Sequence, residues 1–175
     1  VVSNLALHWF PAKVYKPSLA WTYSFWLGTI SGALFFLLIL SGLPLMFLYI
    51  PSVERAYQSV KDIEYVVTFG WWLRAVHRIG AHLMVVSVVL HLARVFFTGA
   101  YKNGVGEGQR REWNWVIGVA MLLLTLFLSF TGYLLPWDQL AFWAVTVGTN
   151  IASSVPLDGP KIRELLIGGR AIEQA

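Results

Sequence analysis

Three apolar stretches, Phe25–Ile50, Gly70–Phe97 and Trp115–Leu135, constrain this chain more than any other feature of its sequence. The hydrocarbon core of a bilayer is about 30 Å thick, and an α-helix crosses it with about 20 mostly apolar residues. Each of the three stretches is long enough to do so. Charged residues make up only 13% of the chain, against about 25% in a soluble domain. We therefore expect an all-α integral membrane protein with three spanning helices.

Prolines mark where two of these helices end. A proline lacks the backbone N–H that an α-helix needs, so a helix commonly stops just before one. Pro51 follows the first apolar stretch, and Pro136 follows the third. We expect the spanning helices to occupy residues 21–50, 67–98 and 113–135.

The segments outside the spanning helices are predicted to lie on the membrane surface. Residues 1–20 carry aromatic and basic side chains, which suits an interfacial segment bound to lipid. Ser52 is placed to cap a short amphipathic helix over Val53–Val60. Residues 137–175 are too polar to span a bilayer and predict further surface helices, one of which starts at Pro160.

The distribution of charge predicts the topology. The segment before the first span and the loop after the second are basic, whereas the loop after the first span and the tail after the third are acidic. Basic segments tend to stay on the cytoplasmic side of a membrane. We therefore expect a cytoplasmic N-terminus in a bacterial inner membrane. The distribution of the net charge of +4 is then explained by the side of the membrane on which each segment lies, and the charge does not indicate nucleic-acid binding.

Three histidines lie within the second apolar stretch, where ionisable residues are costly and mark functional sites. His77 and His91 are fourteen residues apart, so on an α-helix they lie within about 40° of one face and about 21 Å apart along the axis. His82 points about 140° away from His77. A single histidine in a membrane helix is commonly a hydrogen-bonded contact between helices, and that alternative stays open. Two on one face favour a pair of ligands.

Two pairs of glycines repeat the same fourteen-residue interval. Gly28 and Gly42 lie in the first apolar stretch, and Gly118 and Gly132 lie in the third. Glycines are common in membrane helices because they let helices pack closely, so one such pair would carry no weight. Two pairs that match the histidine pair indicate two flat bodies stacked across the membrane, each ligated by a histidine and pressed against glycine backbones. Porphyrins fit that description.

Arginines near the histidines fit the same interpretation. Arg74 precedes His77 by three residues and Arg94 follows His91 by three, so each lies one turn toward the nearer membrane surface. A haem carries two propionates, and a carboxylate at membrane depth needs a cation. Arg78 is adjacent to the first histidine and could serve the same role. The alternative is that these side chains snorkel to lipid headgroups.

Four long segments of the sequence are jointly specific: they are "GWWLRAVHRIGAH…LHLAR", "REWNWVIGV", "TGYLLPWDQLAFWAVTVGTN" and "IASSVPLDGPKIRELLIGG". They resemble the N-terminal domain of cytochrome b, from bc-type respiratory complexes and their chloroplast-type relatives. The resemblance covers nearly the whole chain, so we expect residues 1–175 to form a single domain of this family. It implies a four-helix bundle that binds two b haems.

The resemblance implies a role for each residue singled out above. His77 would be an axial ligand of the low-potential haem on the outer side, and His91 of the high-potential haem on the inner side. The four glycines and three arginines, joined by Trp115, would face or hold the haems. An outer quinol-oxidation pocket would be bordered by a further set of residues, Tyr133, Pro136, Trp137, Trp143 and Ala144. From the residues alone, that aromatic segment predicts an interfacial belt.

The chain departs from the family in three ways. The family takes the second ligand of each haem from a fourth helix, and this sequence ends at Ala175, where that helix should begin. We expect the rest of a longer cytochrome b, or a separate chain, to supply it. The family's loop that completes the quinol site is missing from these residues too. Chloroplast-type relatives attach an extra haem through a cysteine, but Trp26 holds that place and the chain has no cysteine, so no covalent haem is expected.

The expected function is that of a dihaem electron-transfer subunit in a quinol–cytochrome c (or similar) oxidoreductase complex, inactive as an isolated chain. The resemblance implies quinol as substrate, and a Rieske-type iron–sulfur protein and a c-type cytochrome as partners in a dimeric complex within membrane lipids. Electrons would cross between the haems, coupled to proton translocation. Two alternatives stay open. One is a dihaem, quinone-linked membrane anchor of another dehydrogenase, and the other is a haem-free transporter or assembly subunit with His77 and His91 as proton relays.

Overall fold

The computed structural model of this chain describes residue 21 and residues 25–102, 112–156 and 158–168. The predicted interfacial segment 1–20 lies outside these described residues, and so does most of the basic loop after the second span. The described residues form six α-helices and no strand, which confirms the all-α class. The helices are α3 (Leu27–Leu48), α4 (Ala56–Tyr65), α5 (Gly70–Phe97), α6 (Glu112–Leu134), α7 (Gln139–Ser153) and α8 (Gly159–Ile167).

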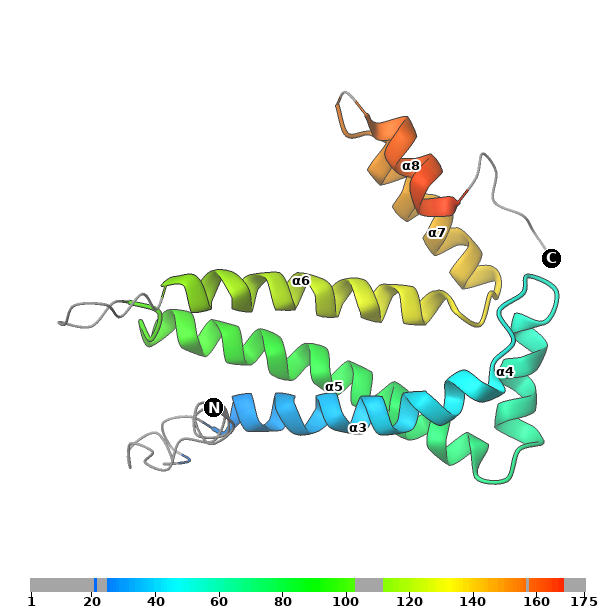
Figure 1. Cartoon of the computed structure of the whole chain (residues 1–175), viewed down its shortest axis with the longest axis horizontal. Helices are drawn as coiled ribbons and strands as arrows, with labels where there is room; N and C mark the ends of the chain where they lie inside the picture. The colour runs from blue at the N-terminus through cyan, green and yellow to red at the C-terminus, as the bar shows by residue number, and fades with distance from the viewer. Residues whose placement is uncertain (1–20, 22–24, 103–111, 157, 169–175) are drawn as a thin grey trace, which may run out of the picture.

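Three of these helices, α3, α5 and α6, are long and apolar enough to cross a membrane. They lie side by side as long rods, with α4 across one end and the α7–α8 pair projecting from that same end (Figure 1). Their outward surfaces are apolar, since Phe47, Leu40 and Leu128 are 82%, 70% and 68% exposed. Such surfaces are stable against lipid or another helix rather than against water. The three predicted spans of an integral membrane protein are thus confirmed.

Two spanning helices begin later than predicted, because left-handed backbone angles precede them. Phe25 and Trp26 have φ angles of 47° and 48°, so α3 starts only after them and not at residue 21. Phe69 has a φ of 60°, and α5 starts immediately after it. A residue with a Cβ rarely adopts this conformation, and it cannot continue a right-handed helix.

The predicted short surface helix is α4, and it begins at Ala56 rather than at Val53. Ser52 does act near its start: its side-chain oxygen accepts a hydrogen bond from the Arg55 backbone N–H at 3.2 Å, and its carbonyl accepts one from the Ala56 N–H at 2.8 Å. These bonds close a turn that precedes the helix. α4 then continues to Tyr65, well beyond the predicted end.

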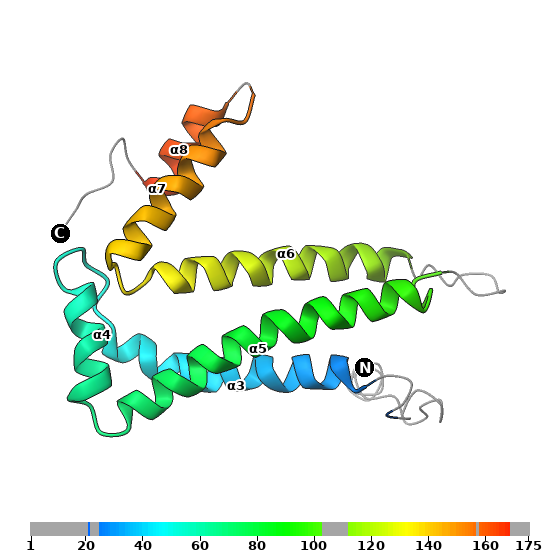
Figure 2. The ribbon, with the colours of Figure 1, turned by 180° about the vertical axis from the view of Figure 1, so that it is seen from behind.

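Small residues line the contact between α3 and α5, which lie antiparallel (Figure 2). The hydroxyl oxygens of Ser31 and Ser87 are 3.0 Å apart, and Gly80 lies against the Leu38 side chain. Small residues let membrane helices approach closely, and hydroxyl pairs join them where no water is present. Residue numbers rise along α3 as they fall along α5. This register places glycines of α3 opposite histidines of α5.

The junction between α6 and α7 lies at the end of the molecule that α4 crosses (Figure 1). α6 ends at Leu134, Pro136 follows, and Trp137 has a left-handed φ of 49°. The Asp138 carboxylate then caps α7 by accepting a hydrogen bond from the Ala141 backbone N–H at 2.8 Å. The predicted break at Pro136 is confirmed.

The two surface helices α7 and α8 pack against each other beyond this junction. α8 begins at Gly159 with Pro160 in its first turn, close to the predicted start, and it stops at Gly168, which has a φ of 68°. Gly159 lies so near α7 that an added Cβ would collide with the Ser153 carbonyl. Only glycine fits at this turn, so the two helices can fold tightly together.

Candidate functional site

The antiparallel register brings each of the two face-sharing histidines of α5 against a glycine of α3. A Cβ added to Gly42 would lie 3.0 Å from His77 Cε1, and one added to Gly28 would lie 3.1 Å from His91 Cε1. Packed proteins rarely hold atoms so close, so a side chain at either glycine would have to move the ring. The histidines of α5 and the glycines of α3 share a fourteen-residue interval because the same histidine–glycine contact occurs twice along this helix pair. His82 is exposed and makes neither contact.

A buried hydroxyl fixes the orientation of the His77 ring. The Ser41 residue is 4% exposed, and its side-chain oxygen lies 2.9 Å from His77 Nδ1. The hydroxyl also lies 2.7 Å from the Leu37 carbonyl, to which it can donate its single proton. In that arrangement the oxygen accepts from Nδ1–H, and Nε2 keeps the lone pair with which a histidine binds a metal.

His91 lacks the equivalent hydrogen bond. Its Nδ1 atom is buried and has no hydrogen-bond partner among the described residues. The residue before Gly28 is Leu27, whereas the residue before Gly42 is Ser41. A buried polar atom without a partner is unusual in a native structure and asks for an explanation. The two histidine sites thus share a glycine and differ in the side chain beside it.

The two glycines of α6 border more open space. A Cβ on Gly118 would meet the Leu92 side chain at 3.4 Å, and a Cβ on Gly132 would meet nothing within 4 Å. Trp115 packs against Phe96 and Tyr101, with ring centroids 5.7 and 5.5 Å away. In this structure Trp115 therefore holds the start of α6 against the end of α5.

The predicted cationic residues differ in their surroundings. The Arg74 guanidinium forms an ion pair with the Glu64 carboxylate of α4, and both side chains are about one-third exposed. Arg94 is half-buried, one turn beyond His91, whereas Arg78 is exposed. Glu64 was not among the predicted site residues. Its pairing with Arg74 links α4 to the first turns of α5.

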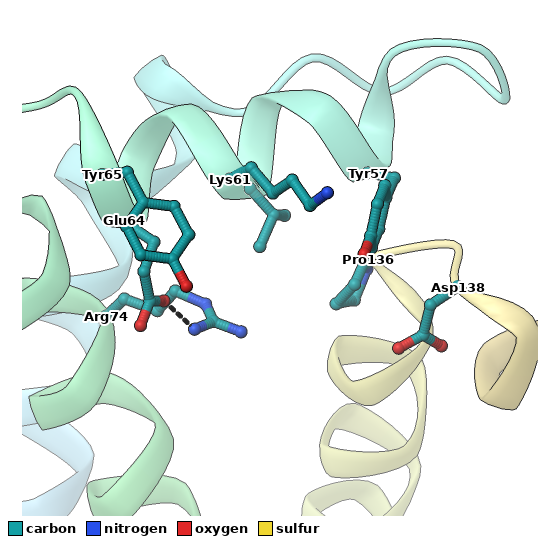
Figure 3. A pocket seen from close by; sticks show the side chains of 8 residues that line it. Tyr57, Lys61, Glu64, Tyr65, Arg74, Pro136 and Asp138 are labelled. Carbon is teal, nitrogen blue, oxygen red and sulfur yellow. Dashed lines mark hydrogen bonds and ion pairs between the residues drawn. The ribbon is translucent and has the colours of Figure 1, made fainter.

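A cleft of about 240 Å³ opens where α4 meets the start of α5 and the α6–α7 junction (Figure 3). Its lining is aromatic and charged, with one aliphatic residue and one proline: Tyr57, Tyr65, Lys61, Arg74, Glu64, Asp138, Val60 and Pro136. Of the five residues predicted to border a quinol pocket, Pro136 lines this cleft. Tyr133 and Trp143 are exposed, and Trp137 and Ala144 are half-buried outside its lining.

Comparison with known proteins identifies the family to which these features belong. The family model described as Cytochrome b/b6/petB matches residues 12–175. The chain belongs to the cytochrome b family. The resemblance predicted from the four sequence segments is therefore confirmed, and it extends over nearly the whole chain.

Several relatives show how much of a cytochrome b this chain represents. The cytochrome b6 of Tupiella akineta is 40% identical over 149 residues, which cover 85% of this chain and 66% of that protein. The menaquinol:cytochrome c reductase cytochrome b subunit of Geobacillus thermodenitrificans is 46% identical over 130 residues, covering 74% and 55%. A chain of a hyperthermophilic respiratory Complex III matches with a TM-score of 0.68 at 26% identity, covering 93% and 46%. The chain thus spans about half to two thirds of the length of these relatives.

Membership of the cytochrome b family implies a b-type haem, and the residues present fit that group. The Ser41 hydroxyl engages His77 at Nδ1, which leaves Nε2 for a ligand, and the His91 ring lies against Gly28 as the His77 ring lies against Gly42. A glycine beside each ring leaves space that a Cβ would fill. Lone histidines suit a cofactor that brings its own equatorial ligands. Within the described ranges, no three His, Asp or Glu side chains gather as a site for a bare metal ion.

Proposed function

We propose that this cytochrome b chain carries electrons across the membrane between two b haems, within a quinol-oxidising bc-type complex. The observation that supports this most is the pairing of His77 with Gly42 and of His91 with Gly28 on one antiparallel helix pair. Fourteen residues of α-helix separate the two histidines by about 21 Å. That separation suits two cofactors stacked in a hydrocarbon core about 30 Å thick.

In this proposal, His77 and His91 would each hold one haem. Bound haem would supply the one-electron redox chemistry. Gly28 and Gly42 keep side chains away from the ligand rings, and the glycines of α6 border more open space. The Ser41 hydroxyl, 2.9 Å from Nδ1, would orient the His77 ring with Nε2 toward its haem. The chain thereby controls each haem through ligation, hydrogen bonding and burial.

Arg74 and Arg94 are proposed to bind haem propionates near the two ends of α5. Arg74 already pairs with Glu64, but a guanidinium has five N–H donors and can bind a second carboxylate. Arg94 is half-buried one turn beyond His91, which suits the same role. Arg78 is exposed, so snorkelling to lipid headgroups explains it better than a propionate does.

The cleft beside the α6–α7 junction is proposed as part of the quinol-oxidation site. It offers aromatic and polar groups next to Pro136, at the end of α5 that carries Arg74 (Figure 3). A quinol oxidised there would release two protons and two electrons, one electron toward the haem held by His77 and one toward an iron–sulfur partner. The exposed rings of Tyr133 and Trp143 would border the site from the membrane surface.

The remaining parts of the complex are proposed from the relatives, from the family resemblance and from the charge pattern of the loops. The Geobacillus relative is named as a menaquinol:cytochrome c reductase subunit, which supports a quinol donor and a cytochrome c acceptor. A further helix, on this polypeptide or another, would supply the second ligand of each haem. We propose a single haem-binding domain in a bacterial inner membrane, with a cytoplasmic N-terminus, in a dimeric complex with a Rieske-type protein.

A redox titration followed in the visible spectrum tests this function. The complex that contains this chain should show the reduced α-band of b haem, and the band should develop in two one-electron steps. It should also reduce cytochrome c with quinol as donor, which a dihaem anchor of another dehydrogenase would not do. A spectrum without a b-haem band would contradict the proposal and favour a haem-free transporter or assembly subunit.

A further inference from the structure

The two histidine rings of α5 share a glycine contact and differ in the hydrogen bond at Nδ1. Each ring lies against a glycine of α3, at nearly the same distance from the position of an added Cβ. His77 Nδ1 lies 2.9 Å from the Ser41 hydroxyl, whereas His91 Nδ1 is buried and has no partner in the part of the chain that the structure describes. The residue before the glycine differs between the two sites: Ser41 precedes Gly42, whereas Leu27 precedes Gly28.

A hydrogen bond at Nδ1 changes how strongly a histidine donates electrons to iron. When Nδ1–H donates to an acceptor, the ring becomes a more basic ligand and stabilises the ferric over the ferrous state. A haem with such a ligand therefore has a lower reduction potential than one without it. Ser41 takes the acceptor role when its own proton goes to the Leu37 carbonyl at 2.7 Å.

We propose that Ser41 is a positioning residue that lowers the reduction potential of the haem bound through His77 relative to the haem bound through His91. The inference rests on the function proposed above and adds the pair of residues, Ser41 and Leu27, that separates the two potentials. Electrons move toward the couple of higher potential. The difference therefore drives transfer from the His77 haem to the His91 haem, which is the direction from the quinol cleft across the membrane.

A purely structural role for Ser41 makes a different prediction. Serines in membrane helices commonly bond the carbonyl of the preceding turn or a polar group of a neighbouring helix, and so serve packing alone. Ser31 on the same helix does both, since its hydroxyl bonds the Leu27 carbonyl at 2.9 Å and reaches Ser87 of α5 at 3.0 Å, not a histidine. If Ser41 only helped α3 and α5 to pack, removing either hydroxyl would affect the haems equally.

Redox titration of the complex tests the proposal, with the spectrum of His77→Ala used to assign the two α-bands. Ser41→Ala should raise the midpoint of the His77 haem, so that at the parent's midpoint the ratio of reduced to oxidised haem rises roughly three- to tenfold. A tenfold change corresponds to about 59 mV for a one-electron couple. Ser31→Ala, the matched control from the same interface, should shift neither haem.

The reciprocal variant Leu27→Ser should lower the midpoint of the His91 haem by offering its Nδ1–H an acceptor. If Ser41→Ala does not assemble with haem, Leu27→Ser tests instead whether a hydrogen bond at Nδ1 sets the midpoint. An unchanged His77-haem midpoint in Ser41→Ala, or an equal shift in Ser31→Ala, would overturn the proposal. So would an unchanged His91-haem midpoint in Leu27→Ser when Ser41→Ala cannot be measured. A parent complex without b-haem bands would instead overturn the proposed function itself.

Discussion

At the scale of single residues, small side chains of α3 set the space and the hydrogen bonding around the histidines of α5. A larger residue at Gly42 or Gly28 would displace a ring, and the Ser41 hydroxyl lies 2.9 Å from His77 Nδ1. In the proposed function, none of these three residues binds a cofactor itself. Each either leaves space for a histidine ring or hydrogen-bonds to it, so its effect is measurable only through that histidine.

Gly42→Ala should weaken the site of His77, because the new methyl group would lie 3.0 Å from Cε1 and would have to push the ring away. Overpacking of this kind costs about 1–3 kcal/mol. We expect less haem per polypeptide and a lower temperature for heat-induced loss of one α-band. Gly32→Ala is the matched control, since a Cβ there meets nothing within 4 Å. An equal loss in the control would show that helix packing in general, and not the ring contact, is responsible.

Arg74→Gln should lower the midpoint of the His77 haem, and Arg94→Gln should lower that of the His91 haem. Removing a nearby cation destabilises the reduced, more negative state. The expected shift is of the order of 1–2 kcal/mol, since unit charges about 10 Å apart interact by about 1.7 kcal/mol at an effective dielectric constant of 20. Redox titration measures it, with exposed Arg78→Gln as the control. Unchanged midpoints in the first two variants would leave snorkelling as their only role.

At the scale of helices, the features that could be predicted are those that depend on one helix alone. Apolar length predicted the three spans, and the α-helical period predicted that His77 and His91 share a face of α5. The starts of α3 and α5 were wrong because the left-handed residues before them, Trp26 and Phe69, are bulky aromatics. Neither is a glycine, so no sequence signal marked the interruption.

Contacts between helices could not be predicted, because they depend on register and on turns. Ser41 gains its role only once α3 lies antiparallel to α5 at one particular offset. Glu64 meets Arg74 because the chain turns tightly between α4 and α5, where a Cβ on Gly70 would collide with the Ile63 carbonyl. In the sequence, Ser41 is only a serine in an apolar stretch, and Glu64 is only an acid ten residues before an arginine. Neither pattern by itself predicts a contact between helices.

Asp138→Ala should loosen the start of α7, because the carboxylate that accepts from the Ala141 N–H is removed. Loss of such a cap costs about 1 kcal/mol, which corresponds to about a fivefold faster amide exchange where exchange proceeds by local opening. Hydrogen exchange of the first turn of α7 measures this. Asp138→Asn keeps an accepting oxygen and should exchange like the parent. Equal acceleration in both variants would mean that the charge, and not the cap, matters.

At the scale of the whole molecule, the three spanning helices leave one side of the proposed haem sites uncovered by the described chain. No residue of α6 is buried, and Gly132 borders open space. The chain spans 46–66% of the length of the relatives compared above. In the function proposed here, haem and a further helix occupy that side, and the second ligand of each haem comes from there.

The haem content of the complex after replacement of each histidine tests the central claim most directly. His77→Ala should abolish one b-haem signal and leave the other, and His91→Ala should do the reverse, because each ring is proposed as a ligand of a different haem. His82→Ala should leave both signals intact, since that side chain is exposed and contacts neither glycine of α3. Loss of a haem in His82→Ala while His91→Ala retains both would contradict the assignment.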